Sequence, residues 1–189
     1  MAHKVLLITA LLLMALVFGA GAVAGEYHGT VVDADTGRPI ADAVVVVVWY
    51  KKARFAFPAG DAPIHFHAAK ETMTDEAGRF ATSAARKIEW NPFTRVDVPQ
   101  IVIYRPGYEA FSPRDASRRG FASFREVEET LLDGARIRLR KLQEPECKQT
   151  GVVTGLSSLG IILDIPPNNI PNLTRLIREQ RERCGMQSS

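Results

Sequence analysis

Residues 44–48 are five consecutive valines, and Trp49 and Tyr50 follow them directly. Valine is branched at Cβ, which leaves it few side-chain rotamers and favours the extended backbone of a strand. An apolar run this short, bounded by turn residues, is typical of a strand in the core of a sandwich rather than of a helix. The run therefore predicts a β-strand that is buried on both faces, around which the rest of the domain is arranged.

Six further segments have the composition or the alternation of strands, and turn residues separate most of them. Together with the valine run they make roughly seven short strands, which is the number in a typical β-sandwich. The expected fold class is therefore mainly β. The expected strands lie at residues 27–33, 43–50, 64–74, 79–82, 98–104, 127–132 and 135–142.

Two turns are expected to close β-hairpins. Asp75 and Gly78 stand first and fourth in a four-residue turn, as a type I turn prefers, and they predict a hairpin between the strands on either side. Asp133 followed by Gly134 is a second hairpin signal. Residues 85–97, in contrast, are expected to form a loop.

The last expected strand alternates arginines with apolar residues, so Ile137, Leu139 and Leu142 should point inward and the arginines outward. A second group of arginines lies in the C-terminal tail. A solvated polar face explains both groups, and the alternative is contact with an anionic envelope surface. The arginines concerned are Arg136, Arg138, Arg140, Arg175, Arg178, Arg181 and Arg183.

The N-terminus has the outline of a secretory signal peptide. A short basic start leads into an apolar stretch over residues 5–18, and Ala22 and Ala24 then give the small-x-small pattern of a signal peptidase site. We expect cleavage after Ala24, which removes residues 1–24 and leaves a periplasmic or secreted chain that is not integral to the membrane. The alternative is that residues 5–23 are retained as an anchor, since they are nearly long enough to span a bilayer.

Charge excludes one class of partner. Lys4 is the one Lys, Arg, Asp or Glu within residues 1–24, so the mature chain has 23 basic and 21 acidic residues and a net charge of +2. That excess is too small to indicate a nucleic-acid partner.

Residues 144–189 are expected to form a helical tail. Helices are predicted at residues 148–163 and 170–184, and together they would make a C-terminal α-helical hairpin. The two cysteines of the chain, Cys147 and Cys184, stand where the two ends of such a hairpin would meet. Because both lie in the exported part, an oxidising compartment favours a disulfide between them.

Four stretches of sequence in a fixed order carry a family resemblance. They are Gly29-Thr30-Val31-Val32-Asp33, residues 36–46, residues 71–80 and Tyr104-Arg105-Pro106-Gly107-Tyr108. The segment that contains them resembles the carboxypeptidase regulatory-like family, also described as transthyretin-like or prealbumin-like domains. The resemblance implies a transthyretin-like β-sandwich over residues 25–143. In carboxypeptidases the catalytic zinc sits in a separate domain, so the resemblance implies an architecture and not an activity.

His65 and His67 are the best metal-ligand candidates in the chain. They stand two apart on an expected strand, so both imidazoles should project from one face, and Glu71 should lie on that same face. The alternative is that both are surface histidines beside a loop, because the sequence offers no third ligand at a suitable spacing.

Enzyme signatures are missing from the sequence. Some transthyretin-like proteins hydrolyse a purine-derived ring, and their family pattern includes a C-terminal Tyr-Arg-Gly-Ser, whereas this chain closes with Gly185-Met186-Gln187-Ser188-Ser189. The chain contains no nucleophile elbow, P-loop or HExxH motif.

We therefore expect a non-enzymatic exported module without a cofactor, which binds or assembles with another envelope protein or a glycan. The first alternative is a metal-binding or sensing protein that uses His65 and His67. The second is a transthyretin-like hydrolase.

Overall fold

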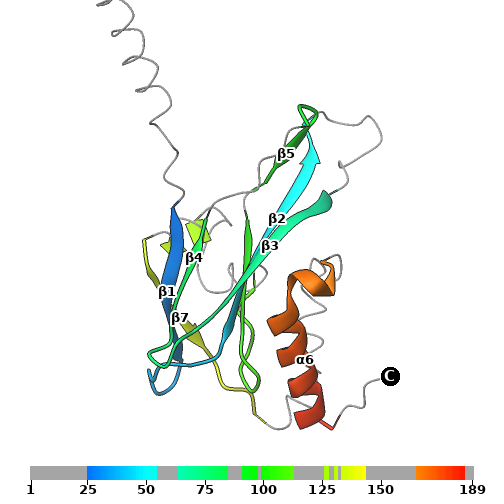
Figure 1. Ribbon diagram of the computed structural model, residues 1–189. Helices are drawn as coiled ribbons and strands as arrows, with labels where there is room; N and C mark the ends of the chain where they lie inside the picture. Colours follow the sequence, from blue (N-terminus) through cyan, green and yellow to red (C-terminus); the bar gives the residue numbers. More distant parts are fainter. Residues whose placement is uncertain are drawn as a thin grey trace, which may run out of the picture.

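The computed structural model describes most of the chain from residue 25 onward. Within the described residues the protein is mainly β, with two sheets and a C-terminal helix, α6 (Pro171–Arg183), that lies beside one of them (Figure 1). The predicted mainly β, two-sheet architecture is confirmed at this level. The described residues are 25–54, 64–84, 91–97, 99–112, 126–127, 130–131, 133–143 and 165–185.

The first sheet has the strand order β4-β1-β7. Its central strand, β1 (Glu26–Asp33), pairs antiparallel with β4 (Arg79–Ser83) and parallel with β7 (Ala135–Leu139). Along β7 the predicted alternation is confirmed, because Ile137 and Leu139 are buried while the arginines between and beside them are exposed.

The second sheet is built on the valine run. Its central strand, β2 (Val44–Ala53), pairs antiparallel with β3 (Ile64–Met73) on one side. On the other side β2 pairs first with β6 (Gln100–Tyr104) and then, further along, with β5 (Thr94–Val96).

The valine run is buried on both faces, as predicted. Successive side chains of a strand point to opposite faces, so the run divides between two apolar clusters. Val45, Val47 and Trp49 belong to the core between the two sheets. Val44, Val46, Val48 and Tyr50 face the other way, where they pack with Leu173 and Leu176 of α6.

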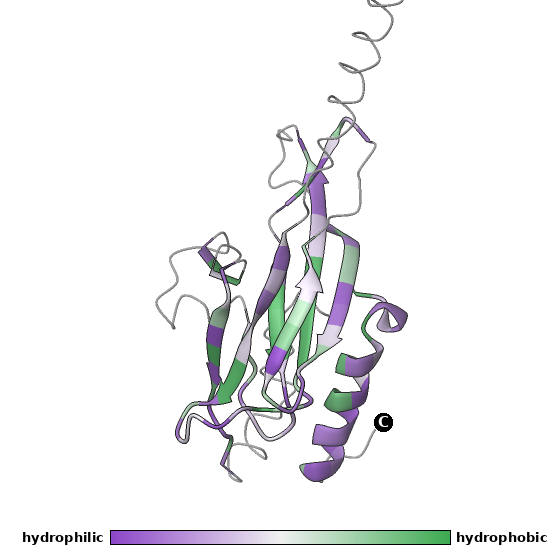
Figure 2. Ribbon diagram, turned by 60° about the vertical axis from the view of Figure 1, so that its left-hand side comes forward, coloured by the Kyte–Doolittle hydropathy of each residue, from purple (hydrophilic) through white to green (hydrophobic). Residues whose placement is uncertain are grey.

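Helix α6 makes the third layer of the molecule. Figure 2 shows its apolar stripe turned toward the second sheet and its polar face turned away. The helix is held near its C-terminus as well, because the buried Gln180 accepts a hydrogen bond of 2.6 Å from the backbone N–H of Gly107. A short 3-10 turn, η2 (Pro167–Asn169), precedes α6.

The turn at Asp75 forms, but the predicted hairpin around it is wrong. Gly78 N–H donates to the Asp75 carbonyl at 2.8 Å, and Gly78 adopts a φ of +69°. However, β3 pairs with β2 and β4 pairs with β1, so the turn carries the chain from one sheet to the other. A turn sequence fixes the local reversal of the chain and leaves open whether the two flanking strands pair with each other.

The strand predicted at residues 127–132 is also wrong. The described residues of this segment are helical, and the Thr130 hydroxyl donates to the carbonyl of Glu126 one turn earlier at 2.7 Å. Val127 and Leu131 are both buried in the core between the sheets, because a spacing of four residues puts them on one face of a helix. Residues 85–97, expected as a loop, contain β5.

Several sequence predictions fall outside the described residues. They include the signal segment at residues 1–24, the first tail helix at 148–163 and Cys147. Among the described residues, no helix has both the length and the apolar character needed to cross a bilayer.

Candidate functional site

One end of the second sheet projects beyond the remainder of the described structure. The end of β2, the start of β3 and all of β5 form a ribbon that continues past the end of α6 and past the first sheet (Figure 1). We call residues 50–54, 64–67 and 91–97 the projecting ribbon.

Pairing across the ribbon brings apolar and basic side chains into one row. Lys52 is opposite Ile64 on β3 and opposite Arg95 on β5, so these three side chains share a face. Beyond them, the backbone N–H of Arg54 donates to the Phe93 carbonyl at 2.8 Å, and its guanidinium Nε donates to the carbonyl of Thr94 at 2.8 Å. These two bonds join the ends of the β2 and β5 segments.

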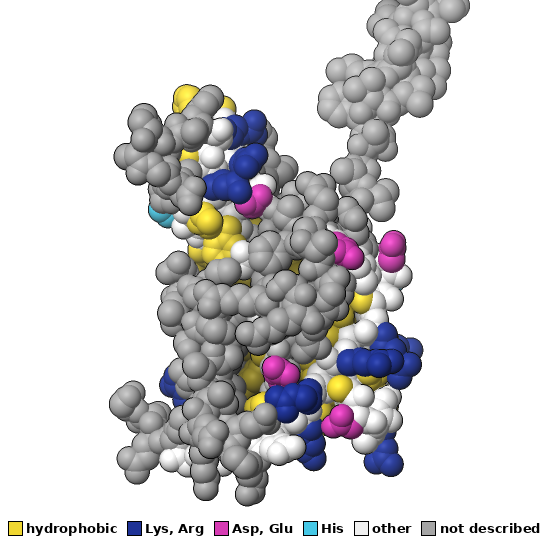
Figure 3. All heavy atoms as spheres, turned by 180° about the vertical axis from the view of Figure 1, so that it is seen from behind, with side chains coloured by type: hydrophobic (Ala, Val, Ile, Leu, Met, Phe, Trp, Pro, Cys, Tyr) yellow, Lys and Arg dark blue, Asp and Glu magenta, His cyan; other side chains and the backbone are white. Residues whose placement is uncertain are grey.

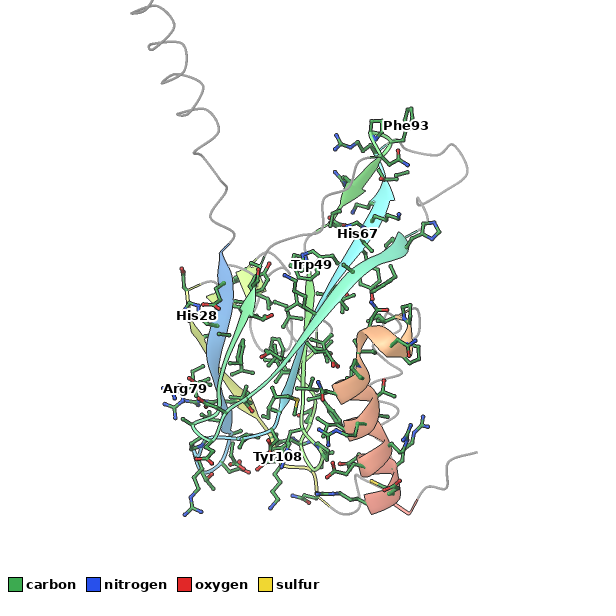
Figure 4. The ribbon with its side chains drawn as sticks, in the orientation of Figure 1. His28, Trp49, His67, Arg79, Phe93 and Tyr108 are labelled. Atoms are coloured by element: carbon green, nitrogen blue, oxygen red, sulfur yellow. The ribbon has the colours of Figure 1, made fainter. Side chains whose placement is uncertain are left out.

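The ribbon exposes large apolar side chains. Ile64 is 61% exposed and Phe93 is 64% exposed, and they are the exposed large hydrophobic residues of the described part of the chain. Figure 4 shows Phe93 at the far end of the ribbon. In Figure 3, hydrophobic side chains and Lys or Arg side chains gather at this projecting end.

The ribbon is also positively charged. Its described residues include four basic side chains and one acidic side chain, which gives a net charge of +3. The acidic residue, Asp97, forms an ion pair with Lys52. The other three basic residues are Lys51, Arg54 and Arg95.

An open depression lies on the outer face of the first sheet. Its lining includes His28, Thr30, Arg79 and Asp133. Arg79 donates to the carboxylate of Asp75 at 2.9 Å, and the hydrogen bonds and charge of Arg79 hold the pKa of Asp75 below its ordinary value. Because the charges of Arg79 and Asp75 offset each other, the depression offers a ligand less electrostatic attraction than the ribbon does.

Glu71 does not share a face with His65. His65 is opposite Lys51 of β2, whereas Glu71 is opposite Val46, and Lys51 and Val46 point to opposite faces of that strand. The cause is a β-bulge at His67, where the register between β2 and β3 shifts by one residue. The described residues contain no group of three or more His, Cys, Asp or Glu side chains that could hold a metal ion. Metal binding through His65 and His67 alone stays a prediction.

Glu71 caps helix α6 from outside. Its two carboxylate oxygens accept hydrogen bonds from the backbone N–H groups of Asn172 at 2.9 Å and Leu173 at 2.8 Å. The residue in the N-cap position is Ile170, whose side chain cannot accept a hydrogen bond, and Pro171 follows it. A carboxylate in this place satisfies helix N–H groups and interacts favourably with the helix dipole. Glu71 therefore positions α6 on the second sheet.

Replacing Glu71 with alanine should destabilise the protein by about 1 to 2 kcal/mol, the usual cost of losing an N-terminal cap. Glu71→Gln keeps one acceptor oxygen and should cost about half as much. Urea unfolding followed by circular dichroism measures both. Glu76→Ala, which removes an exposed carboxylate from the same region, is the control and should change stability by less than about 0.5 kcal/mol. Equal effects of the alanine substitutions at Glu71 and Glu76 would contradict the capping role.

The arginines predicted to form a polar face make local contacts. Arg136 donates to the Gly37 carbonyl at 3.2 Å, and Arg140 donates to the Glu109 carboxylate at 3.3 Å. On α6, Arg183 donates to Glu179 one turn earlier at 2.9 Å. These partners favour a solvated polar face over a surface reserved for an anionic ligand.

Comparison with known proteins does not identify a family. No protein-family model matches the chain, and no curated protein sequence matches it. Among solved structures, the chain is similar to 3-chlorocatechol 1,2-dioxygenase from Rhodococcus opacus 1CP, with 19% sequence identity and a TM-score of 0.31. The match covers 62% of this chain and 59% of that chain. A TM-score this low supports no conclusion about fold or activity.

The ribbon was only partly visible from the sequence. Residues 51–63 interrupt the pattern between the strands expected at 43–50 and 64–74, but Phe93 and Arg95 fall in a segment expected to be a loop. The dipeptide Asn91-Pro92 was the available signal, because it favours a turn that could start a short strand. Its pairing with β2 depends on contacts far along the chain.

Proposed function

We propose that this protein is an exported, non-enzymatic β-sandwich of transthyretin-like architecture that binds or assembles with an envelope component through its projecting ribbon. The observation that carries the proposal is the exposure of Ile64 and Phe93 beside four basic side chains at one end of the molecule. Exposed apolar side chains gathered in one place mark interaction sites on soluble proteins.

The finer features of the fold belong to the same proposal. They are a sandwich of roughly seven strands, a C-terminal hairpin of two helices and a disulfide between Cys147 and Cys184. The described part of the chain contains no free cysteine thiol, which supports the disulfide. Such a bridge would close the loop between the two helices, and by the chain-entropy account it would contribute about 3 to 4 kcal/mol to stability.

Photocrosslinking in intact cells tests where the protein contacts its partner. The full chain is expressed with p-benzoyl-phenylalanine in place of Phe93, and in a second strain in place of Arg178 on the exposed side of α6. We expect a reproducible adduct from the ribbon position, because its exposed side chain should lie in the interface. The measurement is mass spectrometry of the irradiated product, which identifies a protein, glycan or lipid adduct.

Position 178 is the control, and it shows whether an adduct at position 93 reflects a specific contact of the ribbon. Position 178 should give little product, because Arg178 is exposed on α6 and lies outside the projecting ribbon. Adducts of equal yield at the two positions, or none at position 93, would refute the ribbon as the binding surface.

A further inference from the structure

We propose that the projecting ribbon docks on the surface of an anionic lipid bilayer, with Ile64 and Phe93 entering the interface and the basic side chains facing lipid phosphates. This inference rests on the proposed function and narrows the envelope component to the membrane itself.

The side-chain chemistry of the ribbon fits a bilayer surface. Lys52 of β2 lies directly opposite Ile64, and Arg95 of β5 lies one strand further along the same row, so both basic residues share a face with the apolar side chain. Apolar side chains gain free energy by entering the boundary between headgroups and acyl chains, and cations beside them remain at the level of the phosphates. Each basic residue close to an anionic membrane adds to the attraction.

The shape of the ribbon favours a membrane over a protein partner. Three neighbouring strands span only about 10 Å from the first to the third. A stable protein interface buries about 800 Å² on each partner, an area that three neighbouring strand ends provide poorly. A bilayer interface, in contrast, accepts a small projecting wedge because the lipids rearrange around it.

The described chain also begins at the ribbon end of the molecule. In Figure 1, β1 begins at the end of the first sheet that lies nearer the projecting ribbon. The residues before it include the apolar stretch at 5–18, which is predicted to direct export through the membrane. Few residues separate that stretch from Glu26, the first residue of β1, so the start of β1 stays close to the bilayer while the apolar stretch is in it.

The positive net charge of the described structure is concentrated at the projecting ribbon. Residues 25–189 carry a net charge of +2, and the described residues of the projecting ribbon carry +3. The other described residues contain 12 basic and 12 acidic side chains and carry no net charge. An anionic surface therefore attracts the ribbon end more strongly than the rest of the described structure, so electrostatics should orient the molecule with the ribbon toward the bilayer.

Vesicle flotation tests the proposal. The full chain is expressed in cells, and the exported protein is purified and used in the assay. We expect binding to vesicles of phosphatidylglycerol and phosphatidylcholine, and much weaker binding to vesicles of phosphatidylcholine alone. The double variant Arg54→Gln/Arg95→Gln should bind the anionic vesicles about 30-fold more weakly. Ile64→Ser/Phe93→Ser should weaken binding about tenfold, because it removes the apolar contribution and leaves the charge unchanged.

The matched control is Arg38→Gln/Arg178→Gln, which removes two charges from exposed positions outside the ribbon and should leave binding within about twofold of the parent. Equal binding to neutral and anionic vesicles, or an equal loss in the control variant, would overturn the membrane proposal. So would an absence of binding to the anionic vesicles. In each of these cases a protein adduct at position 93 in cells would still support the ribbon as a binding surface, which separates this inference from the proposed function.

Discussion

Trp49→Ala should destabilise the protein by about 3 to 5 kcal/mol, the usual cost of removing a fully buried aromatic side chain. Trp49 is 1% exposed and lies in the core between the two sheets, where Val47, Ile101 and Phe111 belong to the same cluster. The ammonium group of Lys70 lies 5.8 Å from the centre of its ring, and this contact is lost as well. The measurement is the free energy of unfolding in urea, followed by circular dichroism.

Trp49→Phe should cost much less, below about 1.5 kcal/mol. The indole Nε1 of Trp49 is buried and finds no hydrogen-bond partner among the described residues. Phenylalanine keeps a ring in the core and removes this unsatisfied donor, so part of the packing loss is offset. If Trp49→Phe lowered the free energy of unfolding as much as Trp49→Ala does, the indole nitrogen would contribute to the stability of the fold, contrary to this expectation.

Leu173→Ala should destabilise the protein by about 2 to 5 kcal/mol, and the loss should be concentrated at helix α6. Leu173 is 0% exposed and packs with the valines on the outer face of β2. Its own N–H group is also one of the two that Glu71 caps, so the side chain and the cap hold the same turn of the helix. Hydrogen exchange followed by mass spectrometry should show that the substitution accelerates exchange more in α6 than in β1.

Arg178→Ala is the matched control on the exposed side of the same helix. It should change stability by less than about 0.5 kcal/mol and leave the exchange of α6 unaltered. If Leu173→Ala accelerated exchange equally in α6 and in the first sheet, α6 would be an inseparable part of one folding unit, contrary to the expectation.

The sequence predicted those parts of the fold that depend on a local pattern. The valine run indicated a strand buried on both faces, and the alternation along β7 indicated which residues are buried. The apolar stripe from Ile170 to Ile177 indicated the C-terminal helix. In each case the periodicity of the side chains is a direct consequence of strand or helix geometry, so a short window of residues contains the information.

Tertiary structure decided which segments meet. The turn ending at Gly78 connects two sheets instead of closing a hairpin, and the bulge at His67 puts His65 and Glu71 on opposite faces. Glu71 looked like a metal ligand in the sequence and instead caps a helix about 100 residues further along the chain. The projecting ribbon exists because β5 joins β2 beyond the end of β6. Strand partners and register follow from the packing of distant apolar faces against one another, and no local window of sequence contains that packing.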